Sequence, residues 1–397
     1  MLVALADAEP STCGGKAGTL GRLVRAGLPV PDGWVVPFAA GRAARPDALP
    51  PGLRDELARA LRALGDPPVA VRSSAGDEDG THASAAGQYA TVLAVQGLDA
   101  VADAVRACWA SLGSRRAVAY RAATASAPDD DPVMAVLVQR LVDAQVSGVM
   151  FTPDAPGGAT VLEAAWGLGA GVVAGTVTPD AYRVAADGAV TCAVADKRTR
   201  VDRSAARVTT SDVPTPDRTR RTLDDDAVHA LAALGRRVAD LLGGAQDVEW
   251  AVADGTAWVL QARPVTAALP APPGPDVTTW AHSSPTAPGL PTPLVGTPGS
   301  RGTATGPARI VRGPADFPRV RPGDVLVCPW TDPAWTPLLR MAAGVVTETG
   351  GVLSHAAIVA RERGVPAVLG VAGATTTLTD GDTLTIDGAA GTVTTHT

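Results

Sequence analysis

The chain has 397 residues, of which 46% are hydrophobic and 19% charged, and its formal net charge is −6. This composition supports two or three packed domains and argues against global disorder, nucleic-acid binding and attachment to an anionic membrane; the four scattered cysteines predict neither a disulfide nor a zinc site. No apolar stretch approaches the ~18 residues that cross a bilayer and the first residues lack a signal-peptide pattern, so we expect a cytoplasmic protein.

The first 266 residues alternate helical and strand patterns, which predicts an α/β or α+β body. Apolar residues recur at helical spacing in residues 17–26, 54–64, 101–112 and 227–242. Apolar and β-branched runs predict strands over residues 69–72, 133–142 and 146–152.

Two basic side chains stand beside small residues at the ends of these elements. Lys16 follows Gly14 and Gly15 at the start of the first predicted helix, where a cation opposes the helix dipole unless an anion is bound. Arg72 ends a strand that leads into a polar loop starting at Ser73, whose N–H groups suit phosphate oxygens. Both are candidate phosphate ligands, although a solvated Lys16 is an equally simple interpretation.

Residues 247–263 predict a hairpin that turns at Asp254–Gly255. When Val248 lies opposite Ala262, one face of the hairpin is apolar and the other polar. Burial of the apolar face therefore favours this register, which requires a three-residue loop and a glycine bulge.

The polar face of this hairpin carries a possible metal site. Glu249 and Gln261 are neighbours in the expected register and offer two oxygen ligands to a hard cation such as Mg²⁺. Arg263 follows on the same face and suits a phosphate. A polar strip that only faces solvent is the alternative that the hairpin alone leaves open.

Proline recurs every few residues over 267–298, which predicts an extended, semi-rigid linker that serves as a hinge or, alternatively, as a passive spacer. The chain is thereby divided into a first domain (1–266), this linker and a last domain (299–397). Short strands are predicted in the last domain at residues 308–311, 325–328, 344–347 and 383–386, around one clear helix.

That helix begins with a histidine. A strand ends at Thr347, Gly350–Gly351 make a turn that would let a phosphoryl donor approach closely, Ser354 is a candidate N-cap, and Gly364 ends the helix. His355 thus lies in the first turn, where the positive helix end keeps imidazole neutral and favours an anion. This suits a nucleophile that becomes phosphorylated, although a histidine is also tolerated there without a function.

The segment TETGGVLSHAAIVARERGVPAVLGV, residues 347–371, resembles the phosphohistidine motif in the swivelling domain of the PEP-utilising enzymes. The upstream segments SRGTATGPARIV and PGDVLVCPWTDPAWTPLL fit the same domain. Scattered motifs over residues 10–266 resemble the ATP-grasp-like domain of that family. The resemblance implies a two-lobed ATP-grasp-like domain followed by a small swivelling β/α domain. One departure is Ser354, where PEP synthases often have Cys.

The resemblance also implies ATP and Mg²⁺ as cofactors and His355 as the residue that carries the phosphoryl group. The ATP ligands that it implies are Lys16, Arg72, Ser73, Gln88, Gln139, Glu249, Gln261 and Arg263, with Glu249 and Gln261 also binding the metal. The loop around the phosphohistidine comprises Thr347, Gly350, Gly351 and Ser354.

By this resemblance the β-phosphoryl group of ATP passes to His355 and then to an acceptor, with release of AMP and phosphate. Several family members add an acceptor barrel of about 250 residues, and we expect none in this sequence. Three interpretations therefore stay open. The chain phosphorylates a small molecule, it passes the phosphoryl group to a separate acceptor protein in a split PEP synthase-like system, or it is a non-catalytic nucleotide-binding module.

Overall fold

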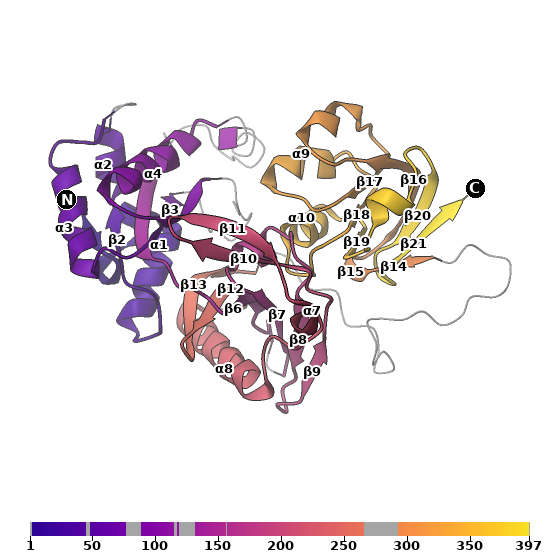
Figure 1. Ribbon diagram of the computed structural model, residues 1–397, viewed down its shortest axis with the longest axis horizontal. Coiled ribbons are helices and arrows are strands. Elements are labelled where there is room, and N and C mark those ends of the chain that lie inside the picture. The colour runs from indigo at the N-terminus through magenta and orange to yellow at the C-terminus, as the bar shows by residue number, and fades with distance from the viewer. Residues whose placement is uncertain are drawn as a thin grey trace.

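The computed structural model of the chain describes residues 2–44, 48–76, 89–114, 117–118, 132–155, 157–265 and 293–396. Three sheets make up most of this part of the chain. The first two lie beside each other and form two lobes, and the third belongs to a separate C-terminal unit, drawn orange to yellow in Figure 1. These are the two lobes and the small β/α domain that the sequence predicts.

The first lobe is an antiparallel sheet with helices packed against it. Its strands, in spatial order, are β1 (Val3–Ala4), β2 (Gly33–Val36), β5 (Met134–Arg140), β3 (Val69–Ala75) and β4 (Thr91–Val95). Its helices are α1 (Pro10–Arg25), α2 (Phe38–Ala43), α3 (Leu53–Leu64) and α4 (Leu98–Ser111), and η1 (Leu5–Asp7) is a 3-10 turn. The helices predicted over 54–64 and 101–112 are thereby confirmed, because their apolar stripes are buried against the sheet.

Helix α1 starts earlier than predicted and is kinked at Gly14, which has φ +80° and ψ 166°. A Cβ atom at Gly14 would lie 2.2 Å from the carbonyl oxygen of Ser74 in β3, so the close approach of α1 to β3 requires glycine. Because of this approach, the turn that carries Lys16 lies directly against the strand that carries Arg72.

The second lobe is a six-stranded sheet. Its strands, in spatial order, are β13 (Thr256–Pro264), β12 (Gln246–Ala253), β6 (Val146–Phe151), β7 (Thr160–Trp166), β8 (Asp180–Val184) and β9 (Val190–Ala193). Around it are α6 (Ala170–Val173), α7 (Thr215–Arg218), α8 (Asp225–Leu242) and a hairpin of β10 (Thr199–Ser204) and β11 (Arg207–Asp212). Leu20 of α1, Leu231 of α8 and Trp250 of β12 belong to one buried cluster, so the two lobes share a core.

The C-terminal unit has an eight-stranded sheet. Its strands, in spatial order, are β14 (Leu294–Val295), β21 (Thr392–His396), β20 (Thr383–Asp387), β16 (Thr303–Ile310), β17 (Val325–Cys328), β18 (Gly344–Thr347), β19 (Ala367–Leu369) and β15 (Thr297–Ser300). Strands β16 to β19 run parallel. The helices are α9 (Thr336–Leu339), α10 (His355–Arg363) and α11 (Ala374–Thr377), with 3-10 turns η2 (Pro314–Arg319) and η3 (Pro333–Trp335).

The proline-rich segment needs a correction at its end. Residues 266–292 lie outside the described residues, but residues 294–300 form β14 and β15, so the C-terminal sheet begins before residue 299. The prolines in this segment argued against a strand in the sequence analysis. Pro298 is tolerated in β15 because that strand lies at an edge of the sheet. The division into domains stays a prediction, with its second boundary moved to about residue 293.

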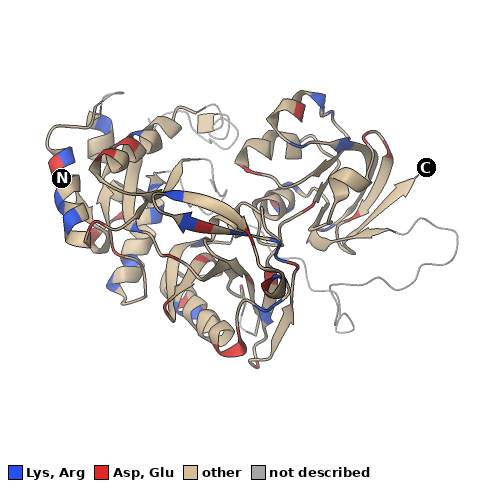
Figure 2. Ribbon diagram, viewed as in Figure 1, with Lys and Arg blue, Asp and Glu red and all other residues tan. Residues whose placement is uncertain are grey.

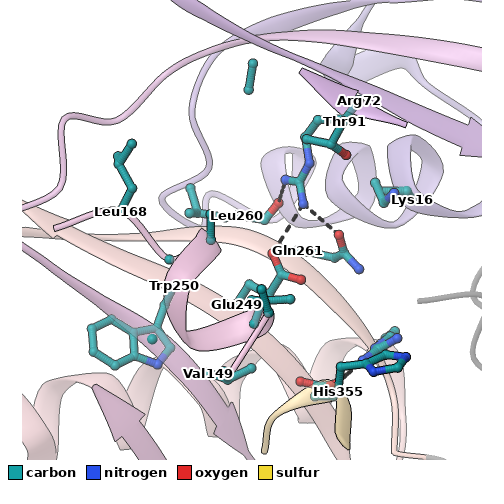
Figure 3. A pocket seen from close by; sticks show the side chains of 18 of the residues that line it. Lys16, Arg72, Thr91, Val149, Leu168, Glu249, Trp250, Leu260, Gln261 and His355 are labelled. Atoms are coloured by element: carbon teal, nitrogen blue, oxygen red, sulfur yellow. Dashed lines mark hydrogen bonds and ion pairs between the residues drawn. The ribbon is translucent and has the colours of Figure 1, made fainter. Parts of the chain in front are cut away.

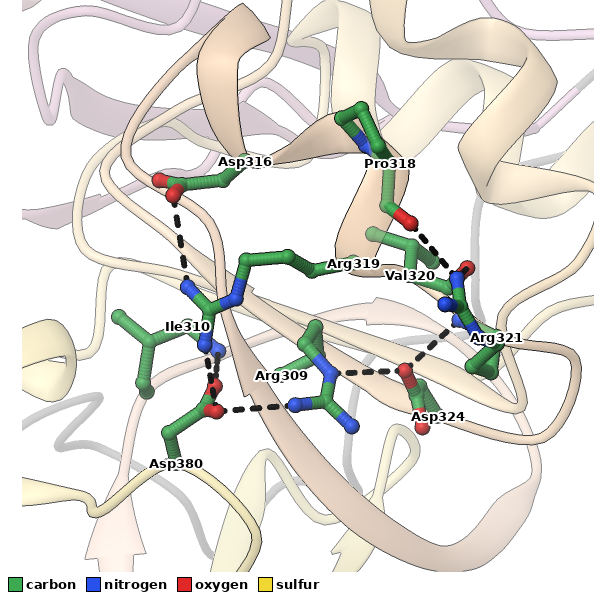
Figure 4. Close-up of polar contacts among 9 residues, drawn as sticks. All are labelled: Arg309, Ile310, Asp316, Pro318, Arg319, Val320, Arg321, Asp324 and Asp380. Carbon is green, nitrogen blue, oxygen red and sulfur yellow. Dashed lines mark hydrogen bonds and ion pairs between the residues drawn. The ribbon is translucent and has the colours of Figure 1, made fainter.

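Ion pairs fasten the outer loops of the C-terminal unit. Arg309 contacts Asp324 at 3.0 Å and Asp380 at 2.9 Å, and Arg319 contacts Asp380 at 2.6 Å (Figure 4). These contacts join β16 and η2 to the loop before β20. All of these residues belong to the C-terminal unit, so the ion pairs hold its own elements together.

Charges of both signs are interspersed along α3 and α8 (Figure 2). Among the described residues, no helix combines the length and the apolar character needed to cross a bilayer.

Candidate active site

A cavity of about 350 Å³ lies where the two lobes meet the C-terminal unit. Polar side chains from all three parts line it, and Figure 3 shows Arg72 facing Glu249 and Gln261, with His355 on the far side of the same space. The residues predicted from the sequence that line this cavity are Lys16, Arg72, Gln139, Glu249, Gln261, Arg263 and His355. The sequence-predicted nucleotide and phosphohistidine residues are therefore brought together.

Arg72 organises the polar wall of the cavity. It lies within β3, which continues to Ala75 rather than ending at Arg72 as predicted. Its guanidinium donates to Gln261 Oε1 at 2.7 Å, to Glu249 Oε2 at 3.3 Å and to the backbone oxygen of Leu260 at 2.6 Å. The planar guanidinium can hold three oxygens in fixed directions. It connects the first lobe to the β12–β13 hairpin of the second.

The hairpin has the predicted register only near the site. Glu249 pairs with Gln261 and Val248 with Ala262, as expected, but the register shifts after Glu249 and the turn is a two-residue Asp254–Gly255 loop. The predicted three-residue loop is therefore wrong. The bulge instead falls at Leu260, which satisfies the burial pattern and turns the Leu260 carbonyl oxygen toward Arg72.

Asp247 and Arg263 form a buried pair beside this wall. Arg263 donates from Nε and Nη2 to Asp247 Oδ2, at 2.8 and 2.6 Å. Burial raises the pKa of Asp247, an effect that the neighbouring guanidinium opposes. Arg263 lines the cavity as predicted, and Asp247 is the partner that fixes its orientation, a role the sequence analysis did not assign.

The remaining predicted nucleotide residues differ in their placement. Lys16 donates from Nζ to the backbone oxygen of Ser73 at 2.9 Å, and its side chain is buried, so the solvated alternative is excluded. Gln139 is buried and donates to the backbone oxygen of Pro31. Ser73 is buried behind the cavity wall rather than among its lining residues. Gln88 lies outside the described residues.

The chemistry of the hairpin face fits a magnesium ion bound together with a nucleotide. Glu249 and Gln261 are direct neighbours across β12 and β13, and oxygens of both face Arg72 in the cavity. Mg²⁺ is usually held by one or two carboxylates plus substrate phosphates rather than by a cage of protein ligands. Among the described residues there is no cluster of three acidic, His or Cys side chains that could hold a metal ion.

His355 is the first residue of α10, and its Nδ1 lies 3.1 Å from Thr331 Oγ1 in the loop after β17. His355 is 8% exposed and lines the same cavity as the predicted nucleotide residues. Ser354 occupies the N-cap position, but its hydroxyl donates to the Gly351 carbonyl oxygen and does not cap the helix. Gly364 ends the helix in the left-handed conformation, as predicted.

The loop before α10 contacts the second lobe. Thr349 Oγ1 donates to the Gly175 carbonyl oxygen at 2.6 Å, and the N–H groups of Val352 and Leu353 donate to the Glu163 carboxylate. The prediction that the glycines leave room for a phosphoryl donor needs a correction, because Gly351 lies against Glu163 of the neighbouring lobe. Gly350 has φ +100°, and Thr347 is buried at the end of β18.

Thr331 and Arg361 therefore contact the site residues although the sequence analysis gave them no role. Glu163 opens the segment EAAWGLG, which by the family resemblance is expected near the nucleotide but was given no contact with the loop before α10. Arg361 of α10 donates to the Val352 carbonyl oxygen at 2.7 Å, and burial lowers its pKa to about 10. All three lie in motifs that carry the family resemblance. The sequence could not predict the contact between the C-terminal unit and the second lobe, in which Glu163 takes part.

Comparisons with known proteins agree with this geometry. Residues 42–274 match the family described as pyruvate phosphate dikinase, AMP/ATP-binding domain, and residues 320–391 match the PEP-utilising enzyme, mobile domain. The chain is 34% identical to a probable phosphoenolpyruvate synthase of Methanothermobacter thermautotrophicus, covering 96% of this chain and 61% of the relative. It is 39% identical to the prodigiosin synthesizing transferase PigC of Serratia marcescens, covering 65% of this chain and 32% of PigC.

The chain thus spans 56% to 61% of the length of three phosphoenolpyruvate synthase relatives. Among solved structures, D-alanine–D-alanine ligase of Bacillus anthracis with ATP matches 64% of this chain and 56% of its own, at 11% identity and a TM-score of 0.31. A TM-score of this size supports no conclusion about function. On the two domain matches and the synthase relatives, the chain belongs to the pyruvate phosphate dikinase family of PEP-utilising enzymes.

Proposed function

We propose that this chain is an ATP-dependent phosphotransferase in which His355 accepts a phosphoryl group from ATP and delivers it to a small-molecule acceptor. The observation that carries the proposal is the shared cavity, which is lined by His355 and by the polar set around Arg72. A nucleophile and the groups that stabilise a phosphoryl transition state must lie within one solvent-restricted space.

The first step forms a bond between a ring nitrogen of His355 and the β-phosphorus of ATP and breaks the bond from that phosphorus to the oxygen bridging it to the α-phosphorus. AMP leaves with that oxygen. The γ-phosphoryl group then passes to water and is released as phosphate, which leaves one phosphoryl group on His355. In the second step the acceptor oxygen replaces the ring nitrogen on phosphorus, and the imidazole is regenerated.

The chain's own residues divide the work of the first step. Lys16, Arg72 and Arg263 offset the negative charge of the phosphates. Glu249 and Gln261 would hold Mg²⁺, which neutralises phosphate charge when bound. Leu168, Leu260 and Val142 form an apolar part of the cavity wall that suits a nucleotide base.

The small-molecule acceptor is supported by PigC, a relative whose name describes the synthesis of a small molecule. The alternative, in which His355 passes the phosphoryl group to a separate acceptor protein, is distinguished by the requirement for that protein. AMP formation that depends on a small molecule and on no second protein supports the first proposal.

The direct test uses purified chain, Mg²⁺ and ATP labelled in the β-phosphate. We expect acid-labile label on the wild-type protein together with AMP, and neither with His355→Ala. Binding of ATP to the His355→Ala variant controls for folding of the nucleotide site. Absence of both label and AMP in the wild type would overturn the proposal and favour a non-catalytic nucleotide-binding module.

A further inference from the structure

The loop 349–353 before α10 contacts the second lobe through both polar and apolar groups. Leu353 and Ile358 pack in one buried cluster with side chains of β6, β7 and α6. Apolar contact of this kind attracts the two surfaces but does not fix their relative position, because it is not directional. The position of His355 in the cavity therefore has to be fixed by polar contacts.

Glu163 of β7 makes the directional contact. Its Oε1 accepts from the N–H of Val352 at 2.5 Å, and its Oε2 accepts from the N–H of Leu353 at 3.1 Å. Both hydrogen bonds cross to the loop that ends at His355. The side chain is 1% exposed, and burial raises its pKa to about 7. A carboxylate is expensive to bury, so its partners have to be in place when it is covered.

Gly351 completes the contact from the other side. A Cβ atom at this position would lie 2.1 Å from Glu163 Oε1 and 2.5 Å from its carboxyl carbon, so any side chain collides with the carboxylate. The nearest atoms to that Cβ all belong to Glu163. Gly351 is also not in a left-handed backbone conformation, so alanine is acceptable to the loop itself. The requirement for glycine therefore comes from the neighbouring lobe.

We propose that Glu163 and Gly351 form a docking contact that positions His355 at the nucleotide cavity, and that this contact exists only while the C-terminal unit faces the second lobe. Glu163 is a positioning residue that acts on His355 through the loop. This inference rests on the proposed function, because it assigns the contact to the ATP-facing half of the cycle.

The contact predicts an unusual pattern of variants. Gly351→Ala should slow the labelling of His355 by ATP about tenfold or more, because the added methyl group pushes the carboxylate away from its two N–H donors and still occupies the space between the loop and the lobe. Glu163→Ala alone should slow it about threefold to tenfold, because the two N–H groups lose their acceptor. The double variant should label at about the rate of Glu163→Ala alone and faster than Gly351→Ala, because the collision is gone.

A second measurement does not depend on activity. Hydrogen exchange at the amides of Val352 and Leu353, followed by mass spectrometry, should be faster in Gly351→Ala and in Glu163→Ala than in the wild type. Gly313→Ala is the matched control, since a Cβ there meets nothing within 4 Å on extended backbone of the same unit. ATP affinity should stay unchanged in all four variants, and the thermal midpoint should stay unchanged in Gly313→Ala.

The results separate the two proposals. Suppose that the wild type labels at His355, and that Gly351→Ala has the same labelling rate and the same amide exchange as the wild type. This result would overturn the docking contact and leave the proposed function intact. A wild type that never labels would overturn the proposed function, and exchange at Val352 and Leu353 would then decide on the docking contact alone. If Gly351→Ala fails to fold, unchanged exchange in Glu163→Ala overturns the contact.

Discussion

The ring of His355 has two nitrogens, and the structure distinguishes them. Nδ1 lies 3.1 Å from the hydroxyl of Thr331, so one of these two atoms donates to the other. If the N–H of Nδ1 donates to the hydroxyl, the lone pair of the neutral ring is on Nε2. A nitrogen that attacks phosphorus needs that lone pair, so the proposed function with Nε2 as the nucleophile requires this tautomer.

This requirement makes Thr331 testable. Thr331→Val keeps the shape of the side chain but removes the acceptor, and we expect the rate of His355 labelling to fall about threefold to tenfold, the value of one hydrogen bond. ATP affinity should not change, because Thr331 does not line the cavity. Thr331→Ser keeps the hydroxyl and should label at nearly the wild-type rate. Equal rates for the valine and wild-type chains would contradict the required tautomer.

The two lysines of the chain are both buried, but only one lines the cavity. Lys197 is fully buried and donates to Asp180 Oδ1 at 2.6 Å, and Asp180 also accepts from the N–H groups of Ala195 and Thr222. Lys197→Met leaves this carboxylate buried without its cation and should lower the free energy of unfolding by about 3 kcal/mol in urea titrations.

The neighbouring residue gives the control for that prediction. Arg198 has a side chain that is 69% exposed and is paired with Asp196 at the surface. Arg198→Met should change the free energy of unfolding by no more than about 0.5 kcal/mol. Equal losses in the two variants would mean that the cost of Lys197→Met does not arise from the buried ion pair.

At the scale of single residues, the sequence predicted those site residues whose partners lie close to them in the chain. Glu249 and Gln261 are neighbours within one hairpin, so spacing alone brought these two together. Glu163 could not be assigned a role in this way, because its partners Val352 and Leu353 lie in another unit of the chain. A contact between units separated by a proline-rich segment leaves no periodic signal in the sequence.

At the scale of elements, the β12–β13 hairpin carries the most detailed test of sequence reasoning. Burial correctly predicted the pairing next to the site, but not where the extra residue would lie. Asp254 and Gly255 have φ values of 50° and 74°, which is the two-residue turn that matches the twist of a hairpin. Because this two-residue turn is favourable, the loop is one residue shorter than predicted. The extra residue lies instead in β13, as a bulge at Leu260.

This turn gives a prediction for stability. Gly255→Val places a β-branched residue in the left-handed region and should lower the free energy of unfolding by about 1–2 kcal/mol, measured by urea titration. The cost is conformational, because a Cβ at Gly255 meets nothing within 4 Å. Asp254→Asn tolerates the same φ and should be nearly neutral. A neutral Gly255→Val would show that the register is held by Arg72 and the bulge rather than by the turn.

The strands of the C-terminal unit show why some elements were easier to predict than others. β17 and β18 are fully buried, parallel and mostly apolar, and the sequence predicted their bounds as the structure has them. β14 and β15 are short edge strands with glycine and proline, whose pairing depends on partners much later in the chain. Local composition therefore assigned them to the linker.

For the whole molecule, docking of the C-terminal unit is linked to the protonation of Glu163. Its pKa is about 7 in the docked pose against an ordinary 4.5, because burial outweighs the two N–H donors and the nearby Arg361 of α10. Arg361 stays charged at neutral pH and interacts electrostatically with both Glu163 and Asp247 of β12, while Asp247 is itself paired with Arg263. When the loop leaves, water reaches the carboxylate and its pKa returns toward the ordinary value.

The docked pose thus binds a proton more tightly than the undocked one. The contribution of Glu163 protonation to the free energy of docking is complete below pH 4.5 and is lost as the pH rises through 7. The total effect over that window is roughly 3 kcal/mol. Docking is then weaker at neutral pH than at acid pH, which suits the proposed role of a carrier that visits two sites.

We therefore expect exchange at the Val352 and Leu353 amides, corrected for intrinsic rates, to increase between pH 5.5 and 8 in the wild type. In Glu163→Gln the side chain cannot ionise, and this increase should disappear even though His355 and Arg361 are still present. The comparison attributes the pH dependence to one carboxyl group, because every other titratable group near the loop is the same in both proteins. A pH dependence of equal size in the glutamine variant would show that another group controls docking.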